Sequence, residues 1–271
     1  MISIKNKKIL ITGASSGIGK ALAVEMSKAG AQLVLTSRKK DLLDNVAREI
    51  IQECPDIPAP LTIPCDVTNT MDIRRLFNTC DKKTGGIDIL INNAGIGVYG
   101  EGDMATLEDY REIMEVNYFG AVQCMLAAIP SMKKKKMGTI VNISSVAALH
   151  GVPFLGGYGA SKAALVAFSQ SLRAELIKDG ISIVVVYPGY TETEFFEHEK
   201  KVGRAQRPEG PYMPVKQVAK SIIKCIEHEK EELVLSLEGK ALSATRKLFP
   251  GLVRRAMNKI AEKLSHNIFL S

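Results

Sequence analysis

The sequence predicts an α/β fold: a doubly wound, seven-stranded parallel sheet in a single domain, followed by a C-terminal helical tail. Two observations carry this prediction. Seven short apolar runs rich in β-branched residues recur along the chain, and stretches with apolar residues at helical spacing separate them. Strands that are apolar almost throughout are typical of sheets covered by helices on both faces. Right-handed crossovers between such strands place the ligand beyond their carboxyl ends, where the strand order reverses.

The expected strands follow one another at intervals that leave room for a helix. They are KILIT (8–12), QLVLTS (32–37), PLTIPC (60–65), DILIN (88–92), TIVNIS (139–144), SIVVVY (182–187) and ELVLSL (232–237). GKALAVEMSKAG, KDLLDNVAREIIQEC and SKAALVAFSQSLRAEL are expected helices between them. The lysine run at 133–136 is expected at a helix carboxyl end, whose dipole favours cations. Residues 1–240 are expected to form one domain, and residues 241–271 an amphipathic helical extension.

Length and composition fit one globular domain. The chain has 271 residues, of which 46% are hydrophobic, enough to bury a substantial core. Its formal net charge of +7 suits an anionic partner, but the basic residues are spread along the chain. A phosphate-bearing cofactor or substrate explains this charge as well as nucleic acid does. Because the chain has no nucleic-acid recognition motif, we expect no nucleic-acid binding.

The cysteines and the first residues bear on the compartment. Five cysteines, with no CxxC pair and no histidine at metal-ligand spacing, predict buried free thiols and no metal site. The opening residues MISIKNKKILITG hold too short an apolar run for a signal peptide, and no apolar run reaches about 18 residues. We therefore expect a cytoplasmic protein, associated with a membrane at most peripherally.

A glycine-rich turn follows the first expected strand. In TGASSGIG (12–19), Gly13, Gly17 and Gly19 stand where the strand turns into a helix. Glycines permit positive φ, let the backbone approach a pyrophosphate and leave the N-terminal helix amides free to bind it. Alone, such a run is also typical of an ordinary tight turn. Its place at the head of the β-α alternation favours phosphate binding.

A phenol and an ammonium stand four positions apart in YGASK (158–162). On a helix, Tyr158 and Lys162 would lie on one face, and a nearby cation favours the phenolate. A tyrosine ordinarily titrates near about 10, so a cation or hydrogen bonds to the anion are needed to bring its pKa toward neutral pH. The same spacing also occurs on solvated helix faces, so the pair alone does not establish chemistry.

Five motifs in this order resemble those of the short-chain dehydrogenase/reductase family. Besides the two above, they are NNAG at 92–95, NISS at 142–145 and PGYTET at 188–193. Each stands at the end of an expected strand or the start of an expected helix, and the similarity extends over about residues 7–237. The resemblance implies a Rossmann-fold dehydrogenase/reductase domain with a substrate lid at 191–213. It also implies hydride transfer between a nicotinamide cofactor and a carbonyl or secondary alcohol.

The resemblance assigns catalytic roles to four residues. Tyr158 would exchange a proton with the substrate oxygen, and Lys162 would lower its pKa and bind the nicotinamide ribose. Ser145 would orient the substrate, so that substrate contacts are expected at Ser145 and Tyr158. Asn117 would support a proton-relay water, although a buried helix asparagine can also simply bond the backbone. Such a set suits the chemistry, because hydride transfer to a carbonyl develops alkoxide character at one oxygen.

The same resemblance places the cofactor at the ends of the strands. Asp66 and Val67 would contact the adenine, and Thr191 and Thr193 would hold the nicotinamide carboxamide. The full set of expected cofactor-binding residues is Gly13, Ser15, Ser16, Gly17, Ile18, Gly19, Ser37, Arg38, Lys39, Asp66, Val67, Asn93, Ala94, Gly95, Tyr158, Lys162, Pro188, Gly189, Thr191 and Thr193.

The end of the second strand favours NADP(H) over NAD(H). NAD-preferring relatives place an acidic residue there to accept from the ribose hydroxyls, whereas an arginine accommodates a 2′-phosphate. This chain has Ser37, Arg38 and Lys39 at that position. The alternative is that the two cations merely decorate a helix start, which is the unfavourable end of the dipole for them. This misfit and the bidentate geometry of a guanidinium favour phosphate recognition.

The sequence says less about the substrate. Phe195 and Phe196 in the lid, with Val98, Tyr99, His150, Val152, Phe154, Leu155 and Tyr190, predict a largely hydrophobic pocket. The charged remainder of the lid is interpreted as mobile surface, and Gly203 and Gly210 as points of movement. We expect a hydrophobic ketone, aldehyde or acyl substrate, lipid-like or steroid-like. A cofactor-binding regulatory or scaffold protein on the same fold is the alternative, which the intact catalytic residues disfavour.

The tail carries an amphipathic pattern at 249–264. Its apolar residues follow helical spacing, Pro250 suits a first turn, and basic residues fill the opposite face. The pattern leaves two roles open. The helix can pack on its own subunit or across the interface of a homo-oligomer, dimer or tetramer. It can also lie in an anionic membrane surface, as a peripheral contact.

Overall fold

The computed structural model describes residues 2–208, 210 and 212–266. At its centre is a seven-stranded sheet in the order β3-β2-β1-β4-β6-β7-β9, with every neighbouring pair parallel. The strands are β1 (Lys8–Thr12), β2 (Gln32–Ser37), β3 (Leu61–Pro64), β4 (Ile89–Asn92), β6 (Gly138–Ile143), β7 (Ile181–Tyr187) and β9 (Glu232–Val234). The predicted fold class is confirmed. Because β2 and β4 flank β1, the strand order reverses beside β1, which is where such sheets bind ligands.

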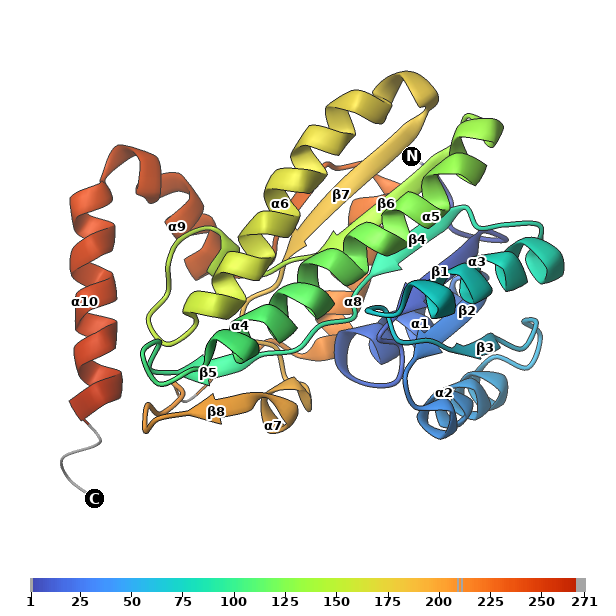
Figure 1. Cartoon of the computed structure of the whole chain (residues 1–271). Helices are drawn as coiled ribbons and strands as arrows, with labels where there is room; N and C mark the ends of the chain where they lie inside the picture. The colour runs from blue at the N-terminus through green and yellow to red at the C-terminus, as the bar shows by residue number, and fades with distance from the viewer. Residues whose placement is uncertain (1, 209, 211, 267–271) are drawn as a thin grey trace.

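Helices cover both faces of the sheet (Figure 1). One face carries α1 (Gly17–Lys28), α2 (Lys40–Glu53) and α8 (Val215–Glu227). The other carries α3 (Thr70–Thr84), α5 (Gly120–Lys135) and α6 (Gly156–Leu176). Successive strand residues alternate between the two hydrophobic cores, so each strand is buried on both sides, as the apolar runs predict.

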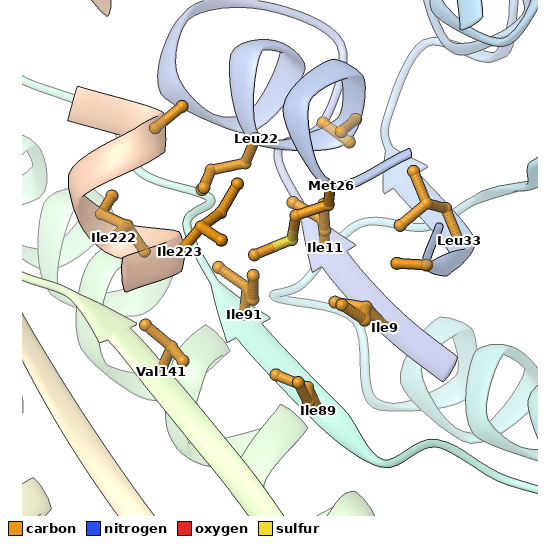
Figure 2. Close-up of a cluster of buried hydrophobic side chains, with 14 of the residues drawn as sticks. Ile9, Ile11, Leu22, Met26, Leu33, Ile89, Ile91, Val141, Ile222 and Ile223 are labelled. Carbon is orange, nitrogen blue, oxygen red and sulfur yellow. The ribbon is translucent and has the colours of Figure 1, made fainter. Parts of the chain in front are cut away.

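Close packing of branched side chains holds the first face together (Figure 2). Leu22 and Met26 of α1 and Ile222 of α8 meet the residues that β1, β4 and β6 direct toward them. Ile9 and Ile11 are fully buried in this layer, whereas Leu10 between them lies in the opposite core. The sheet centre is therefore rigidly packed up to the residues that carry the glycine-rich turn.

The end of the chain differs from the expected pattern. The seventh strand is shorter than the apolar run 232–237, because β9 ends at Val234 and the Ser236 side chain accepts from Gly239 N to begin α9 (Leu237–Leu248). The helix expected over 249–264 is α10 (Pro250–His266), and it packs against α9 at the side of the molecule (Figure 1). Residues 267–271 lie outside the described part of the chain.

Several short elements lie outside the sequence prediction. β5 (Val98–Gly100) pairs in parallel with β8 (Lys200–Val202), and α7 (Phe195–His198) precedes β8. A π-helical turn, η1 (Glu115–Phe119), joins α4 (Leu107–Met114) to α5. The 3-10 turns η2 (Val146–Ala148) and η3 (Ile177–Asp179) flank α6. Elements of three to five residues are too short to show a hydrophobic period, which is why the sequence does not predict them.

One helical stretch, Leu107–Lys135, has the length and apolar composition of a membrane span. It combines α4, η1 and α5. One side of it packs on the sheet, where Cys124, Met125 and Ala128 are buried among side chains of the second core. A core helix with this composition passes the same test, and its packing here is that of a core helix.

Candidate active site

The glycine-rich turn leaves no room for a side chain at Gly13 or Gly19. Gly13 and Gly17 have φ of +62° and +51°. A Cβ on Gly13 would lie 2.8 Å from the Cα of Ala94, and one on Gly19 would lie 2.2 Å from the Gly13 carbonyl oxygen. Ser16 precedes α1 in extended conformation and makes no side-chain capping bond. The first-turn amides of α1 therefore have the arrangement that binds a pyrophosphate.

Thr12 joins this turn to the NNAG segment. Its hydroxyl oxygen accepts from the backbone N–H groups of Asn93 and Ala94, both at 3.0 Å, and donates to Ile91 O at 3.3 Å. The Asn93 side-chain amide donates to Thr12 O and Gly13 O, both at 3.0 Å. Asn93 and Ala94 thus lie directly against the glycine turn. Thr12 is absent from the sequence-based site, although a polar residue at the end of a buried apolar strand could have indicated it.

The end of β2 presents two exposed cations. Arg38 and Lys39 are solvent-exposed, and Lys39 is the N-cap residue of α2 without a side-chain capping bond. Within the described part of the chain neither forms an ion pair. Ser37 is half-buried and its hydroxyl donates to Lys39 O at 3.4 Å. Two cations at the positive end of a helix are unfavourable unless an anion joins them.

Asp66 and Val67 follow β3. The Asp66 carboxylate accepts from the backbone N–H of Thr68 at 2.9 Å and from its hydroxyl at 2.8 Å. Val67 is buried against Gly120, where an added Cβ would lie 2.7 Å from Val67 Cγ2. These contacts fix the loop that follows β3. Ser15 is half-buried in the glycine turn, and Ile18 packs partly against the first core.

Ser145 and Tyr158 converge beyond β6. Ser145 begins η2 with its hydroxyl accepting from Ala147 N at 3.2 Å, and Tyr158 is in the first turn of α6. Burial raises the pKa of the Tyr158 phenol to about 12, whereas a hydrogen bond with the Ser145 side chain acts in the opposite direction. The adjacent Ser144 is buried and donates to Lys162 O at 3.2 Å, a structural contact.

Lys162 lies beside the Tyr158 ring but points elsewhere. Its Nζ is 5.9 Å from the ring centroid and donates to Ile143 O at 2.9 Å. Burial lowers the pKa of the ammonium to about 8, and its residue is only 4% exposed. The lowering of the phenol pKa that we expect from Lys162 stays a prediction, because burial raises the pKa of the Tyr158 phenol here while the ammonium bonds Ile143 O. Burial of the phenol disfavours the phenolate, and the Lys162 ammonium is directed at a backbone carbonyl and not at the phenol oxygen.

Asn117 occupies the π-helical turn and bonds the backbone. Its Oδ1 accepts from Ile96 N at 2.8 Å, and its Nδ2 donates to Ile96 O and to Ser161 Oγ, both at 3.0 Å. This is the alternative that the sequence left open for a buried asparagine. A Cβ on Gly95 would lie 3.0 Å from Asn117 Oδ1 and 3.3 Å from Lys162 Nζ. The Asn117 side chain therefore positions the NNAG loop and α6 close to Lys162.

The residues after β7 return to the glycine turn. Pro188 O accepts from Val146 N at 3.0 Å, which brings this loop beside Ser145. The Thr191 hydroxyl donates to Gly189 O at 3.0 Å, and Thr191 is buried. A Cβ on Gly17 would lie 3.3 Å from the Cβ of Thr193. Two expected cofactor-binding segments that are far apart in the sequence, 13–19 and 188–193, thus meet at the start of α1.

Aromatic side chains enclose the Tyr158 side of the site. The ring centroid of Phe195 lies 5.9 Å from that of Tyr158 and 5.8 Å from that of Phe196. Tyr99, Ala147 and Leu155 form a buried cluster, and the side chains packed against it are those of Val152, Phe154, Tyr158 and Ala205. His150 is exposed. The structure gathers most of the apolar residues that the sequence grouped as a pocket.

The charged part of segment 191–213 is not all surface, contrary to the sequence interpretation. Glu199 and Arg207 form a bidentate ion pair in which the Glu199 side chain is fully buried. The Arg207 Cζ lies 4.3 Å from the Tyr99 ring centroid and 4.2 Å from that of Phe196. Gly203 has a φ of +68° and packs on the Glu101 carboxylate, so it forms a turn there. The segment has many charged residues close together, and nothing in the sequence indicates that Glu199 and Arg207 form a buried pair.

This end of the sheet fits a nicotinamide dinucleotide. Its backbone turn excludes side chains at Gly13 and Gly19, its helix N-terminus lacks a capping side chain, and two exposed cations stand at its edge. The glycine turn and the free amides of α1 match the pyrophosphate of such a cofactor. The described residues include no group of three His, Cys, Asp or Glu side chains that could hold a metal ion.

Comparison with known proteins agrees with this geometry. The sequence profile of the family described as short chain dehydrogenase matches residues 7–202. A "Dehydrogenase/reductase SDR family protein 7-like" of Anopheles gambiae is 35% identical over 270 residues, covering 97% of this chain and 85% of the relative.

Two solved structures bind different cofactors. A short-chain dehydrogenase from Sphingobium yanoikuyae in complex with NADPH is 29% identical with a TM-score of 0.77, covering 92% of this chain and 95% of that one. A 3-ketoacyl-(acyl-carrier-protein) reductase from Brucella melitensis complexed with NADH is 27% identical with a TM-score of 0.77, covering 86% and 98%.

Proposed function

This chain belongs to the short chain dehydrogenase family, and we propose that its own reaction is hydride transfer between NADP(H) and the carbonyl or secondary alcohol group of a hydrophobic substrate. The observation that carries the proposal is the convergence of Ser145, Tyr158 and Lys162 beyond β6, beside the glycine turn. A scaffold protein on the same fold would need none of these three side chains together.

The three side chains divide the work at the substrate oxygen. The bound cofactor supplies or takes up the hydride at the carbon. Ser145 donates a hydrogen bond to the oxygen, and Tyr158 gives or takes its proton. Lys162, held by Ile143 O, provides a positive charge near the phenolate that remains after the Tyr158 proton leaves. Asn117 acts indirectly, because its side chain bonds the Ile96 backbone and Ser161 of α6 and so positions both beside Lys162.

The preference for NADP(H) rests on the end of β2. Arg38 and Lys39 are exposed there beside the N-terminus of α2, and no acidic side chain follows Ser37 before Asp41. A 2′-phosphate would be an anionic partner for these two cations, which form no ion pair within the described residues. The structural relatives include both NADPH-bound and NADH-bound proteins, so the local residues carry this part of the proposal.

A hydrophobic substrate is supported by the aromatic enclosure. The Tyr158 ring packs against Phe195 of α7, which in turn contacts Phe196, and against the cluster that contains Tyr99 of β5. The relative from Brucella melitensis is named for a 3-ketoacyl group on a carrier protein, an apolar chain with a ketone, which is consistent with an acyl or lipid-like substrate here.

The test is turnover by the purified full chain. Long-chain ketones, aldehydes and secondary alcohols are incubated with NADPH or NADH, or with the oxidised cofactors, and the absorbance of the reduced nicotinamide is followed. We expect turnover with at least one substrate class and faster turnover with NADP(H). Tight NADP(H) binding without turnover on any of these substrates would favour the regulatory alternative.

We also propose a cytoplasmic homo-oligomer that touches membranes peripherally. All five cysteines are free and buried, as expected for a reducing compartment. Phe119 and Leu126, seven residues apart on the α4–α5 stretch, are 43% and 58% exposed, an apolar stripe suited to a second copy. For the membrane, Phe249 and Leu252 are exposed where α9 meets α10, and these two helices hold seven Lys or Arg against two Glu.

A further inference from the structure

A buried ion pair lies within segment 191–213, between Glu199 and Arg207. Arg207 uses Nε and Nη2 to contact both carboxylate oxygens of Glu199. The Glu199 side chain is 0% exposed and that of Arg207 is 14% exposed. Taking both charges out of water is unfavourable, and a merely structural contact there could be made by apolar residues. The position of the pair and its free donors therefore bear on function.

The pair lies beside the reacting groups. Phe195 and Glu199 both pack on Gly97, where an added Cβ would lie 3.0 Å from the Phe195 ring and 3.2 Å from Glu199 Cβ. Gly97 follows the NNAG motif, and the Phe195 ring meets that of Tyr158. Burial has the largest effect on the pKa of the Tyr158 phenol and raises it, and both charges are close enough to add to this: Arg207 lowers that pKa and Glu199 raises it.

One edge of the guanidinium has no partner. Glu199 occupies the edge formed by Nε and Nη2. Nη1 is buried and, within the described part of the chain, has no hydrogen-bond acceptor. The Arg207 Cζ lies among the rings of Tyr99, Phe196 and Tyr190, at 4.3, 4.2 and 6.0 Å from their centroids. Nη1 with the second N–H of Nη2 thus forms an oriented fork of donors among apolar rings.

We propose that Arg207 is a substrate-binding residue, and that its free edge binds an oxyanion, a carboxylate or a phosphate, carried by the substrate near the reacting carbonyl. Two parallel N–H groups match two oxygens of such a group, and buried donors without an acceptor are rare in proteins. Glu199 orients the guanidinium so that this edge remains available. The inference rests on the proposed oxidoreductase function and narrows its substrate class to amphiphilic ketones with an apolar chain and an oxyanion.

The test compares matched ketones on the full chain with NADPH. 4-Oxododecanoate is paired with its methyl ester, and 2-oxododecyl phosphate with 1-hydroxy-2-dodecanone, so that the two pairs distinguish carboxylate from phosphate. A charge-assisted pair of hydrogen bonds predicts a kcat/KM about tenfold to a hundredfold higher for the oxyanion in at least one pair. Arg207→Gln should bring this ratio close to one. Arg204→Gln, which changes an exposed arginine three residues away, should leave the ratio at its wild-type value.

A binding measurement separates this inference from the proposed reaction. Calorimetry with dodecanoate, dodecyl phosphate and dodecanol on the NADPH-bound protein reports the oxyanion site even if no ketone is turned over. Because Arg207→Gln leaves a buried carboxylate unpaired, the Glu199→Gln, Arg207→Gln double variant serves if the single one does not fold. The proposal would be overturned if wild type bound dodecanol as tightly as both anions. It would also be overturned if the Arg207 variants lost affinity equally for all three ligands, and the ion pair would then have a structural role only.

Discussion

The Lys162 ammonium donates to the Ile143 carbonyl oxygen, 2.9 Å away, at the last residue of β6. The lysine of α6 is thereby tied to the sheet rather than directed at the phenol one turn before it. Its burial lowers the pKa to about 8 from the ordinary 10.5. Between these two values the unfolded chain binds a proton that the folded chain has released.

This relationship predicts a pH-dependent stability. The free energy of unfolding rises with pH wherever the unfolded state binds more protons, so the Lys162 contribution increases from about pH 8 to about 10.5 and is constant below that window. Lys162→Met removes it. The wild-type minus variant difference in unfolding free energy should therefore grow by on the order of 2 kcal/mol across the window, measured by denaturant titration at several pH values. If the unfolding free energies of wild type and variant changed in parallel with pH, Lys162 would not titrate between about pH 8 and 10.5.

Tyr158→Phe should lower turnover by about a hundredfold or more, since the variant loses the proton donor while the ring still packs on Phe195. NADP(H) affinity should remain close to that of the wild type. Turnover and cofactor titration measure the two effects. Tyr110→Phe is the matched control, because that hydroxyl donates to Gly102 O on an exposed surface. A Tyr158→Phe enzyme with near-native turnover would exclude Tyr158 as the acid.

Arg38→Asp should weaken NADP(H) binding by about tenfold or more and relatively favour NAD(H). The new carboxylate repels a 2′-phosphate but can accept from ribose hydroxyls. Dissociation constants for both cofactors test this, with Arg74→Asp, an exposed change on α3, as the control. If the preference is unchanged in Arg38→Asp, phosphate recognition lies at other residues such as Lys39, Ser15 or Lys20.

Removal of residues 245–271 should abolish sedimentation of the protein with anionic vesicles at low salt. The truncation also removes Val253 and Leu264, which are 5% and 7% exposed, and so disturbs packing. The Phe249→Glu, Leu252→Glu double variant is a sharper probe, because both side chains are more than half exposed and their loss affects only the surface. We expect it to remain in the supernatant while wild type sediments. Equal sedimentation of both proteins would exclude this surface as the contact.

Leu126→Glu should dissociate the proposed oligomer. The side chain is 58% exposed on α5, so the monomer tolerates the charge, whereas an apolar interface does not. Sedimentation equilibrium measures the mass. Leu237→Glu, another exposed leucine on α9, should not change it. An unchanged mass for Leu126→Glu would place any interface elsewhere.

The sheet could be predicted from the sequence because each of its strands is buried on both faces. The runs at 8–12 and 32–37 match β1 and β2 residue for residue. The last run was overextended, because Leu235 and Leu237 continue the apolar pattern although Ser236 begins a helix between them. An apolar run does not distinguish a strand from the start of a helix at its end.

The site was predictable only where a motif fixes the backbone. Gly13, Gly17 and Gly19 stand where a positive φ or a close backbone contact excludes other residues, and their spacing in the sequence therefore indicates the shape of the turn. The direction of the Lys162 ammonium depends on a carbonyl nineteen residues earlier in the chain, at Ile143, and no local pattern contains that information. The pairing of Glu199 with Arg207 likewise arises from tertiary packing, within a segment whose composition is typical of exposed surface.

The Thr12 hydroxyl has a wider consequence. It joins the centre of the sheet to the NNAG backbone with three hydrogen bonds, so we expect the hydrophobic core and the dinucleotide site to lose their structure together on unfolding. A selection for soluble, well-folded variants would therefore also retain cofactor binding. Arg38 and Lys39 have no part in this coupling, because they are exposed and support no packing. If these two residues set the coenzyme preference, as we propose, that preference can be changed by substitution at little risk to the stability of the protein.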